Sequence, residues 1–167
     1  MDAITVRPLD AQADIDWYYA LNEACVPEVN SLSADRLAVL IGRAAYAGAA
    51  WIGDRPAGVA VAFAPDADYD SLNFQWFRAR YSDFVYLDRI MVQDHARGLG
   101  VGKALYHDMF EATKGRFACV GCEVNSVPPN PRSMAFHESL GFQPVGQQQT
   151  EGGAKSVVLL RRDLVRA

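Results

Sequence analysis

The stretch from Arg97 to Lys103 reads Arg-Gly-Leu-Gly-Val-Gly-Lys and carries the strongest structural signal in this sequence. An apolar segment precedes it and an amphipathic segment follows it. Glycines let the backbone turn sharply and leave successive N–H groups uncovered by side chains. At the start of a helix, such N–H groups and the partial positive charge of the helix end bind phosphate groups. The spacing therefore predicts a strand, a turn that holds a pyrophosphate, and a helix, with Arg97 and Lys103 adding positive charge.

Two well-known glycine motifs do not fit this stretch. The dinucleotide-binding pattern requires a glycine where Lys103 stands, three residues after Gly100. The P-loop pattern requires a glycine in place of Arg97 and a serine or threonine in place of Ala104. The alternatives that stay open are an ordinary nucleotide site and a turn whose glycines serve only its geometry.

Strand and helix patterns alternate on both sides of this loop. We expect strands at residues 4–9, 49–53, 59–63, 84–92, 117–124, 142–150 and 155–160. We expect helices at residues 14–25, at 33–44 with Ser33 as N-cap, at 98–114, and in a short segment that ends at Leu140 before Gly141. Central alternation of strands and helices with hairpins outside it predicts an α/β sandwich built on a mixed sheet.

The polar and aromatic stretch from Pro65 to Ser82 is long for a plain connection, and long loops are often functional. We expect it, together with the first two helices, to contribute to substrate specificity. A hydrophobic flap packed on the sheet is the alternative for this stretch.

Length and charge limit the class of protein. The chain has 167 residues and a net charge of -4, which fits one domain spanning 1–167 and no nucleic-acid or anionic-membrane partner. No apolar run approaches the ~20 residues that cross a bilayer, and the start lacks the features of a signal peptide. We therefore expect a cytoplasmic protein.

The three cysteines do not predict a metal site. Cys119 and Cys122 have CxxC spacing, but residues three apart on a strand point to opposite faces. No second pair completes a structural zinc site, so we expect buried, reduced thiols and no metal.

A second motif runs from Asn130 to Phe142 and reads Asn-Pro-Arg-Ser-Met-Ala-Phe-His-Glu-Ser-Leu-Gly-Phe. Together with the glycine loop it resembles the GCN5-related N-acetyltransferase (GNAT) superfamily, and the resemblance covers residues 84–142. It implies an α/β (α+β) fold of one GNAT domain: a mixed, mostly antiparallel twisted sheet flanked by helices on both faces. It also implies acetyl-CoA as co-substrate.

The same resemblance implies which residues contact coenzyme A. The backbone of the strand before the loop would face the pantetheine arm, the loop would hold the pyrophosphate, and the second motif would touch the pantetheine or the nucleotide. These residues are Ile90, Met91, Val92, Arg97, Gly98, Leu99, Gly100, Val101, Gly102, Lys103, Asn130, Ser133 and Phe136.

One catalytic position departs from the family. His137 stands where the family often has a tyrosine that protonates the leaving thiolate. Imidazole, with a free pKa of about 6.5, can donate a proton, so His137 is a candidate general acid, and a structural ring on the helix is the alternative. His95 and His107 are expected on the surface.

The general base is expected on the central strand. Asp88 and Arg89 are its only charged residues, and as neighbours they are expected on opposite faces, unable to pair with each other. In the family an acidic residue on this strand often activates the amine, so Asp88 is the first candidate. A salt bridge to an arginine elsewhere is the alternative role for Asp88, and Glu28 is the second candidate base.

These parts predict an acyl-CoA-dependent N-acyltransferase. It would transfer acetyl from acetyl-CoA to a primary amine of a small molecule or peptide by direct attack in a ternary complex. The backbone near Met91 would polarise the thioester carbonyl. The alternative is a catalytically silent CoA-binding sensor or interaction module. Homodimer formation fits proteins of this kind, but no residue of this sequence requires it.

Overall fold

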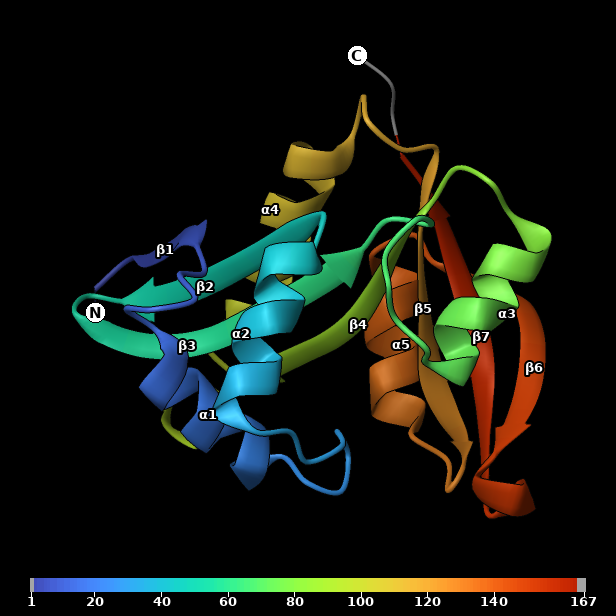
Figure 1. Cartoon of the computed structure of the whole chain (residues 1–167), viewed down its shortest axis with the longest axis horizontal. Helices are drawn as coiled ribbons and strands as arrows, with labels where there is room; N and C mark the ends of the chain where they lie inside the picture. The colour runs from blue at the N-terminus through green and yellow to red at the C-terminus, as the bar shows by residue number, and fades with distance from the viewer. Residues whose placement is uncertain (1, 165–167) are drawn as a thin grey trace. The chain divides into compact units, whose positions relative to one another are not determined.

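The computed structural model describes residues 2–164 and contains a mixed, seven-stranded sheet in the order β1-β2-β3-β4-β5-β7-β6 (Figure 1). The strands are β1 Ile4–Pro8, β2 Tyr46–Ile52, β3 Arg55–Phe63, β4 Val85–Val92, β5 Cys119–Val127, β6 Gln143–Thr150 and β7 Lys155–Asp163. The helices are α1 Ile15–Ala24, α2 Ala34–Arg43, α3 Leu72–Arg80, α4 Val101–Thr113 and α5 Pro131–Ser139, with short 3-10 turns η1 Asp94–Ala96 and η2 Glu151–Gly153. Strands β4 and β5 pair in parallel, and the pairings of β1 with β2, β2 with β3, β5 with β7 and β6 with β7 are antiparallel. The expected fold class is confirmed.

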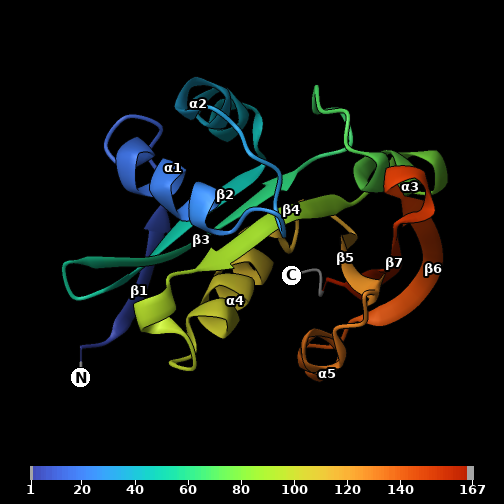
Figure 2. The same cartoon turned by 90° about the horizontal axis from the view of Figure 1, so that it is seen from below.

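The chain divides into two compact units. The first unit comprises the chain up to Ala67 together with Leu87–Ala112. Within it, α1 and α2 cover one face of the strands, and α4 covers the other (Figure 2). Gly58 allows β4 and α4 to approach β3 closely. A Cβ at this position would lie 2.6 Å from the Met91 carbonyl oxygen of β4 and 3.0 Å from the Val101 side chain of α4. A larger residue at this position would push β4 and α4 away from β3.

The second unit comprises Asp68–Tyr86 and the chain from Thr113 onward, with α3 and α5 on opposite sides of its strands (Figure 2). Helix α3 packs its aromatic rings against glycines of the sheet. A Cβ at Gly121 would lie 2.6 Å from the Phe77 ring, and one at Gly146 would lie 2.3 Å from the Trp76 ring. These glycines leave room for the rings that form the core of this unit.

Helix α3 corrects one sequence expectation, because residues 65–82 were predicted to be a loop. Ser71 caps the helix by accepting a hydrogen bond from the Phe74 N–H. The helix buries Phe74, Trp76 and Phe77, which do not make a clean one-face stripe, and its first residue, Leu72, is exposed. The apolar residues of this segment therefore do not recur at the spacing that predicts an amphipathic helix.

Most other element predictions are confirmed. Ser33 caps α2 by accepting from the Arg36 N–H, and Gly141 ends α5 in the left-handed region with φ of 93°. Cys119 and Cys122 are buried and form no disulfide, and burial raises the pKa of Cys119. Within residues 2–164, no helix is long and apolar enough to cross a membrane, and no cluster of three or more His, Cys, Asp or Glu suits a metal ion.

Candidate functional site

The glycine loop links β4 to α4 through η1, and its backbone conformation depends on two glycines. Gly98 and Gly100 adopt φ of 76° and 92°, a region that side chains with a Cβ rarely enter. The loop from residue 97 to 100 is exposed, whereas Val101 is buried and starts α4. The Ala104 N–H donates to the Gly100 carbonyl at 3.0 Å, so the N–H groups before Ala104 precede the first intrahelical bond.

The outer side of this loop is open. A Cβ placed on Gly98 would meet no atom within 4 Å, and one on Gly100 would meet only Ile4, at 3.9 Å. Backbone N–H groups at the start of a 13-residue helix can therefore approach an anion without side chains in the way. The predicted strand-turn-helix is confirmed, and its geometry suits a diphosphate.

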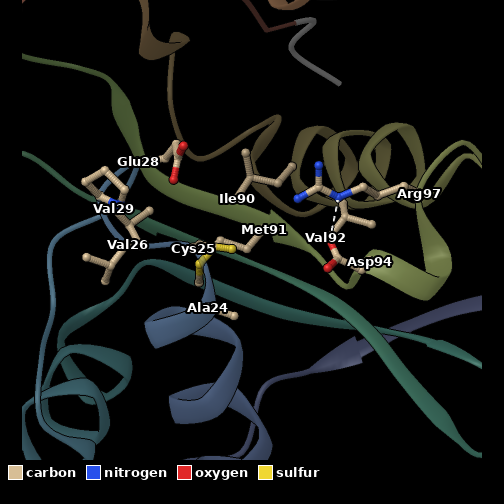
Figure 3. A pocket seen from close by; sticks show the side chains of 11 residues that line it. Ala24, Cys25, Val26, Glu28, Val29, Ile90, Met91, Val92, Asp94 and Arg97 are labelled. Atoms are coloured by element: carbon tan, nitrogen blue, oxygen red, sulfur yellow. Dashed lines mark ion pairs between the residues drawn. The ribbon is translucent and has the colours of Figure 1, made fainter.

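Beside the loop lies a cavity of about 730 Å³ in the first unit. One wall is the connection after α1, and the other is the end of β4 together with residues of η1 and the glycine loop (Figure 3). The lining residues are Ala24, Cys25, Val26, Pro27, Glu28, Val29, Ile90, Met91, Val92, Asp94 and Arg97. Four of the predicted coenzyme A contacts, Ile90, Met91, Val92 and Arg97, thus border one space.

Charge in this cavity is unequally distributed. Arg97 and Asp94 form an ion pair at 3.1 Å, but both side chains are largely exposed, at 70% and 94%. Glu28 is an exposed carboxylate on the opposite wall. The half-buried thiol of Cys25 lies nearby, and burial raises its pKa. Because Arg97 and Asp94 offset each other, Glu28 gives the cavity its acidic character.

Asp88 does not line this cavity; its carboxylate accepts a hydrogen bond from Arg89 Nε at 2.8 Å. The expectation that the two neighbours cannot pair is therefore wrong. The Asp88 and Arg89 side chains are only 7% and 3% exposed. Desolvation makes an isolated buried charge costly, and this outweighs the strand's preference for opposite faces.

Arg89 also reaches two asparagines distant in sequence. Its Nη1 donates to Asn22 Oδ1 of α1 at 2.7 Å, and its Nη2 donates to Asn30 Oδ1 at 2.8 Å. Asn22 Nδ2 donates in turn to the Asn30 carbonyl at 3.1 Å. Burial raises the pKa of Tyr18 to about 12, with the Arg89 charge lowering it and the Asp88 charge raising it. We refer to Asn22, Asn30, Asp88 and Arg89 as the Arg89 network.

The second motif is placed in the second unit. Asn130 caps α5, where its side-chain oxygen accepts from the Ser133 N–H at 3.1 Å. His137 is buried against Phe136 and Phe142, with ring centroids 5.6 and 5.5 Å away. Phe136 is half-buried. These positions give Asn130 and His137 structural partners; whether Asn130, Ser133 and Phe136 contact the cofactor stays a prediction.

His137 is poorly suited to donate a proton. Its Nδ1 lies 2.7 Å from the Ser133 carbonyl oxygen, which can only accept, so Nδ1 carries the hydrogen. Burial lowers the pKa of His137, and the hydrogen bond to Ser133 offsets this only in part. The neutral ring therefore has its single N–H occupied. This geometry favours the structural alternative over the general acid.

Sequence reasoning missed Glu123, the one charged residue in the predicted strand 117–124. In the second unit, Tyr86 OH donates to both oxygens of its carboxylate, at 3.0 and 2.8 Å. On these parallel strands Tyr86 of β4 pairs with Gly121 of β5, two residues before Glu123. A charge within an apolar strand was the signal that could have identified it.

Comparisons with known proteins agree with this geometry. Residues 13–142 match the sequence model of the Acetyltransferase (GNAT) family. No curated protein matches the chain. Among solved structures, the ribosomal-protein-S18-alanine N-acetyltransferase from Escherichia coli superimposes with a TM-score of 0.74 at 19% identity, covering 99% of this chain and 96% of that one.

Two other solved structures contain bound molecules. Arabidopsis thaliana NAA60 in complex with a bisubstrate analogue has a TM-score of 0.75 at 15% identity, covering 99% of this chain and 100% of that one. The NatC complex bound to Gag peptide and CoA has a TM-score of 0.74 at 16% identity, again covering 99% and 100%. At these identities, the likeness shows a shared fold.

Proposed function

Because this chain belongs to the acetyltransferase (GNAT) family, we propose that it transfers acetyl from acetyl-CoA to a primary amine of a small molecule or a peptide. One observation carries the proposal: an open glycine loop at a helix start adjoins a cavity whose other wall bears an acidic side chain. The loop suits a diphosphate, and the cavity suits a cationic amine.

The loop would bind coenzyme A mainly through its backbone. N–H groups from Gly98 to Lys103 would hold the pyrophosphate, since a helix start presents unsatisfied donors and partial positive charge. The β4 backbone at residues 90–92 would face the pantetheine arm, as the family resemblance implies. Arg97 and Lys103 would add an attraction that salt weakens, because both side chains are exposed.

We assign the proton-accepting role to Glu28 instead of Asp88. The attacking amine must lose a proton, since an alkylammonium has a pKa of about 10. Glu28 borders the cavity, whereas the Asp88 carboxylate is buried and bonded to Arg89. In the reaction, the amine nitrogen bonds to the thioester carbon, the C–S bond breaks, and CoA leaves as its thiolate. The nitrogen loses two protons in all: the ammonium gives the first to Glu28, directly or through water, before the attack, and the second, released as the amide forms, passes to the CoA thiolate or to water.

Glu123 is the second candidate base. Its half-buried carboxylate accepts a hydrogen bond from Tyr86 and lies on β5, two residues beyond Gly121, which pairs with Tyr86 of β4. A hydrogen bond from a tyrosine orients a carboxylate without supplying a full opposing charge, unlike the arginine that faces Asp88. The hydrogen bonds from Tyr86 therefore hold the Glu123 carboxylate in one orientation.

The structural neighbours suggest by analogy which class of amine to test as the acceptor. The Escherichia coli neighbour is named for an alanine of a ribosomal protein, and the NatC structure contains a peptide. A peptide amine is accordingly the first acceptor to test here. The cytoplasmic location, the single domain over 1–167 and homodimer formation stay predictions.

The proposal is tested by thiol release from acetyl-CoA with a panel of peptides and small amines. We expect turnover with at least one amine, a loss of ~100-fold or more in kcat for Glu28→Gln, and a far smaller loss for Asp88→Asn. A large loss for Glu123→Gln with normal Glu28→Gln turnover would move the base to β5. Tight CoA binding without turnover on any amine would instead support the silent CoA-binding module.

A further inference from the structure

The loop from Cys25 to Asn30, which forms one wall of the cavity, is held from both of its ends. At its start, the Cys25 N–H donates to the Leu21 carbonyl of α1 at 3.1 Å. Inside the loop, the Val29 N–H donates to the Cys25 carbonyl at 3.1 Å. At its end, Asn30 accepts from Arg89 through its side chain and from Asn22 through its carbonyl. We call this segment the acceptor loop.

Arg89 links the acceptor loop to the strand that forms the opposite wall. The guanidinium presents three nitrogens, and each has a different partner: Nε bonds Asp88, Nη1 bonds Asn22 and Nη2 bonds Asn30. Arg89 is 5% exposed and Asn22 is fully buried, so water does not compete for the bond between them. A planar fork with several fixed donors can hold three partners in one arrangement, which a lysine cannot do.

We infer that Arg89 is a positioning residue for the acceptor amine. By holding Asn30 against β4, it fixes the acceptor loop relative to Ile90 and Met91 and so places Glu28 on the cavity wall. Asp88 serves this network as the counter-charge that allows a guanidinium to be buried. This inference rests on the proposed function, because it assigns the cavity to the acceptor.

Asn30→Ala is the most informative variant, because Asn30 is exposed and its loss removes one bond while leaving Asn22, Asp88 and Arg89 in place. We expect kcat/KM for the amine to fall ~tenfold, as for the loss of one hydrogen bond to a charged group. The Kd for acetyl-CoA should stay within about twofold of the wild-type value, because the bonds of Arg89 to Asp88, Asn22 and Asn30 do not involve the glycine loop. Asn30→Asp keeps the accepting oxygen and should restore most of the activity.

The matched control is Asp163→Ala in the second unit, which also removes an exposed side-chain oxygen that accepts a hydrogen bond from an arginine, here from Arg161 Nε at 2.8 Å. It should change neither kinetic parameter. Arg89→Lys is the second variant; it keeps the charge but loses the fork, and it should impair the acceptor kcat/KM at least as much as Asn30→Ala does.

Hydrogen exchange separates a failure of this inference from a failure of the proposed function. Asn30→Ala should speed exchange at the Val29 N–H, which reports the acceptor loop whether or not any amine is acetylated. Unchanged exchange at Val29 would overturn the anchoring role of Arg89. Faster exchange with unchanged acceptor kcat/KM would overturn the positioning role. An inactive wild-type protein would overturn the proposed function, and the acceptor role of the loop with it.

Discussion

The two loops that border the cavity take their shapes from different sources. The glycine loop is exposed, and its turn is set locally by the positive φ of Gly98 and Gly100. The acceptor loop is set from a distance, because Arg89 lies 67 residues from Asn22 and 59 residues from Asn30 along the chain. The first loop is built from backbone groups that a short motif specifies. The second depends on side-chain partners that only the tertiary structure brings together.

The largest effect that separates the two loops is expected for Arg89→Met. The change leaves Asp88 as a buried charge without its guanidinium and removes donors from two asparagines, which costs about 3–5 kcal/mol in unfolding free energy. Urea denaturation measures this loss. Arg55→Met, at an exposed position of the same unit, should change the unfolding free energy by no more than about 0.5 kcal/mol. Equal effects from the two variants would contradict the role of the Arg89 network.

The second largest effect tests the glycine loop. Gly100→Val forces a β-branched residue to φ of 92°, a strain of about 2 kcal/mol that the loop relieves by leaving its CoA-binding shape. At ~1.4 kcal/mol for each tenfold, the Kd for CoA should rise ~30-fold or more while the core stays folded. Calorimetric titration with CoA measures the change.

Gly152→Val is the matched control for that variant. Gly152 also has a positive φ, of 65°, and a Cβ there would meet nothing within 4 Å, but it lies in the η2 turn of the second unit. It should leave CoA affinity unchanged. Wild-type CoA affinity in Gly100→Val would remove the basis for the acetyltransferase proposal.

Much of the fold was predictable because local signals coincided with packing. Ser33 as a cap, Gly141 as a stop and the apolar run of β4 each specify structure within a few residues. Helix α3 was missed since its period is visible only once Gly121 and Gly146 are seen to face its rings. The sequence around α3 does not indicate which distant glycine packs against which aromatic ring.

The sequence likewise predicted one part of the candidate site, the glycine loop, and not the parts that depend on distant residues. The strand-turn-helix of the glycine loop follows from the residue types at positions 97–103. The pairing of Asp88 with Arg89 contradicts strand alternation, because the cost of an unpaired buried charge exceeds the cost of bending two side chains together. Glu28 could be named only as a second candidate, because its place on the cavity wall depends on distant residues.

His137 in the second unit resembles Asp88 in that both are buried and hydrogen-bonded within the protein, His137 to the Ser133 carbonyl and Asp88 to Arg89. Burial lowers the pKa of His137 below the usual 6.5, so the unfolded chain binds the proton more tightly than the folded one. Its contribution to stability is therefore complete above pH ~6.5 and is lost as the pH falls toward the depressed folded pKa.

The corresponding variant is His137→Asn, which keeps an N–H near the Nδ1 position but does not titrate. Its unfolding free energy should decrease less than that of the wild type between pH 7 and pH 5. Urea denaturation at several pH values measures the two slopes. Parallel slopes would show that His137 does not titrate as a buried ring. If the variant keeps near-normal kcat, His137 is not the acid that protonates the thiolate.

The smallest effect is expected for Arg97→Gln and decides how the glycine loop attracts its ligand. The Arg97 side chain is 70% exposed and already faces Asp94, so its attraction for a diphosphate is weak and screened. The Kd for CoA should rise only about threefold at low salt, and this difference should shrink at high salt. Asp94→Asn removes the competing carboxylate and should tighten CoA binding slightly under the same conditions. A loss as large as that of Gly100→Val, at any salt concentration, would mean that a side chain and not the backbone carries the diphosphate. The contrast between the two loops would then disappear, since both would depend on a guanidinium.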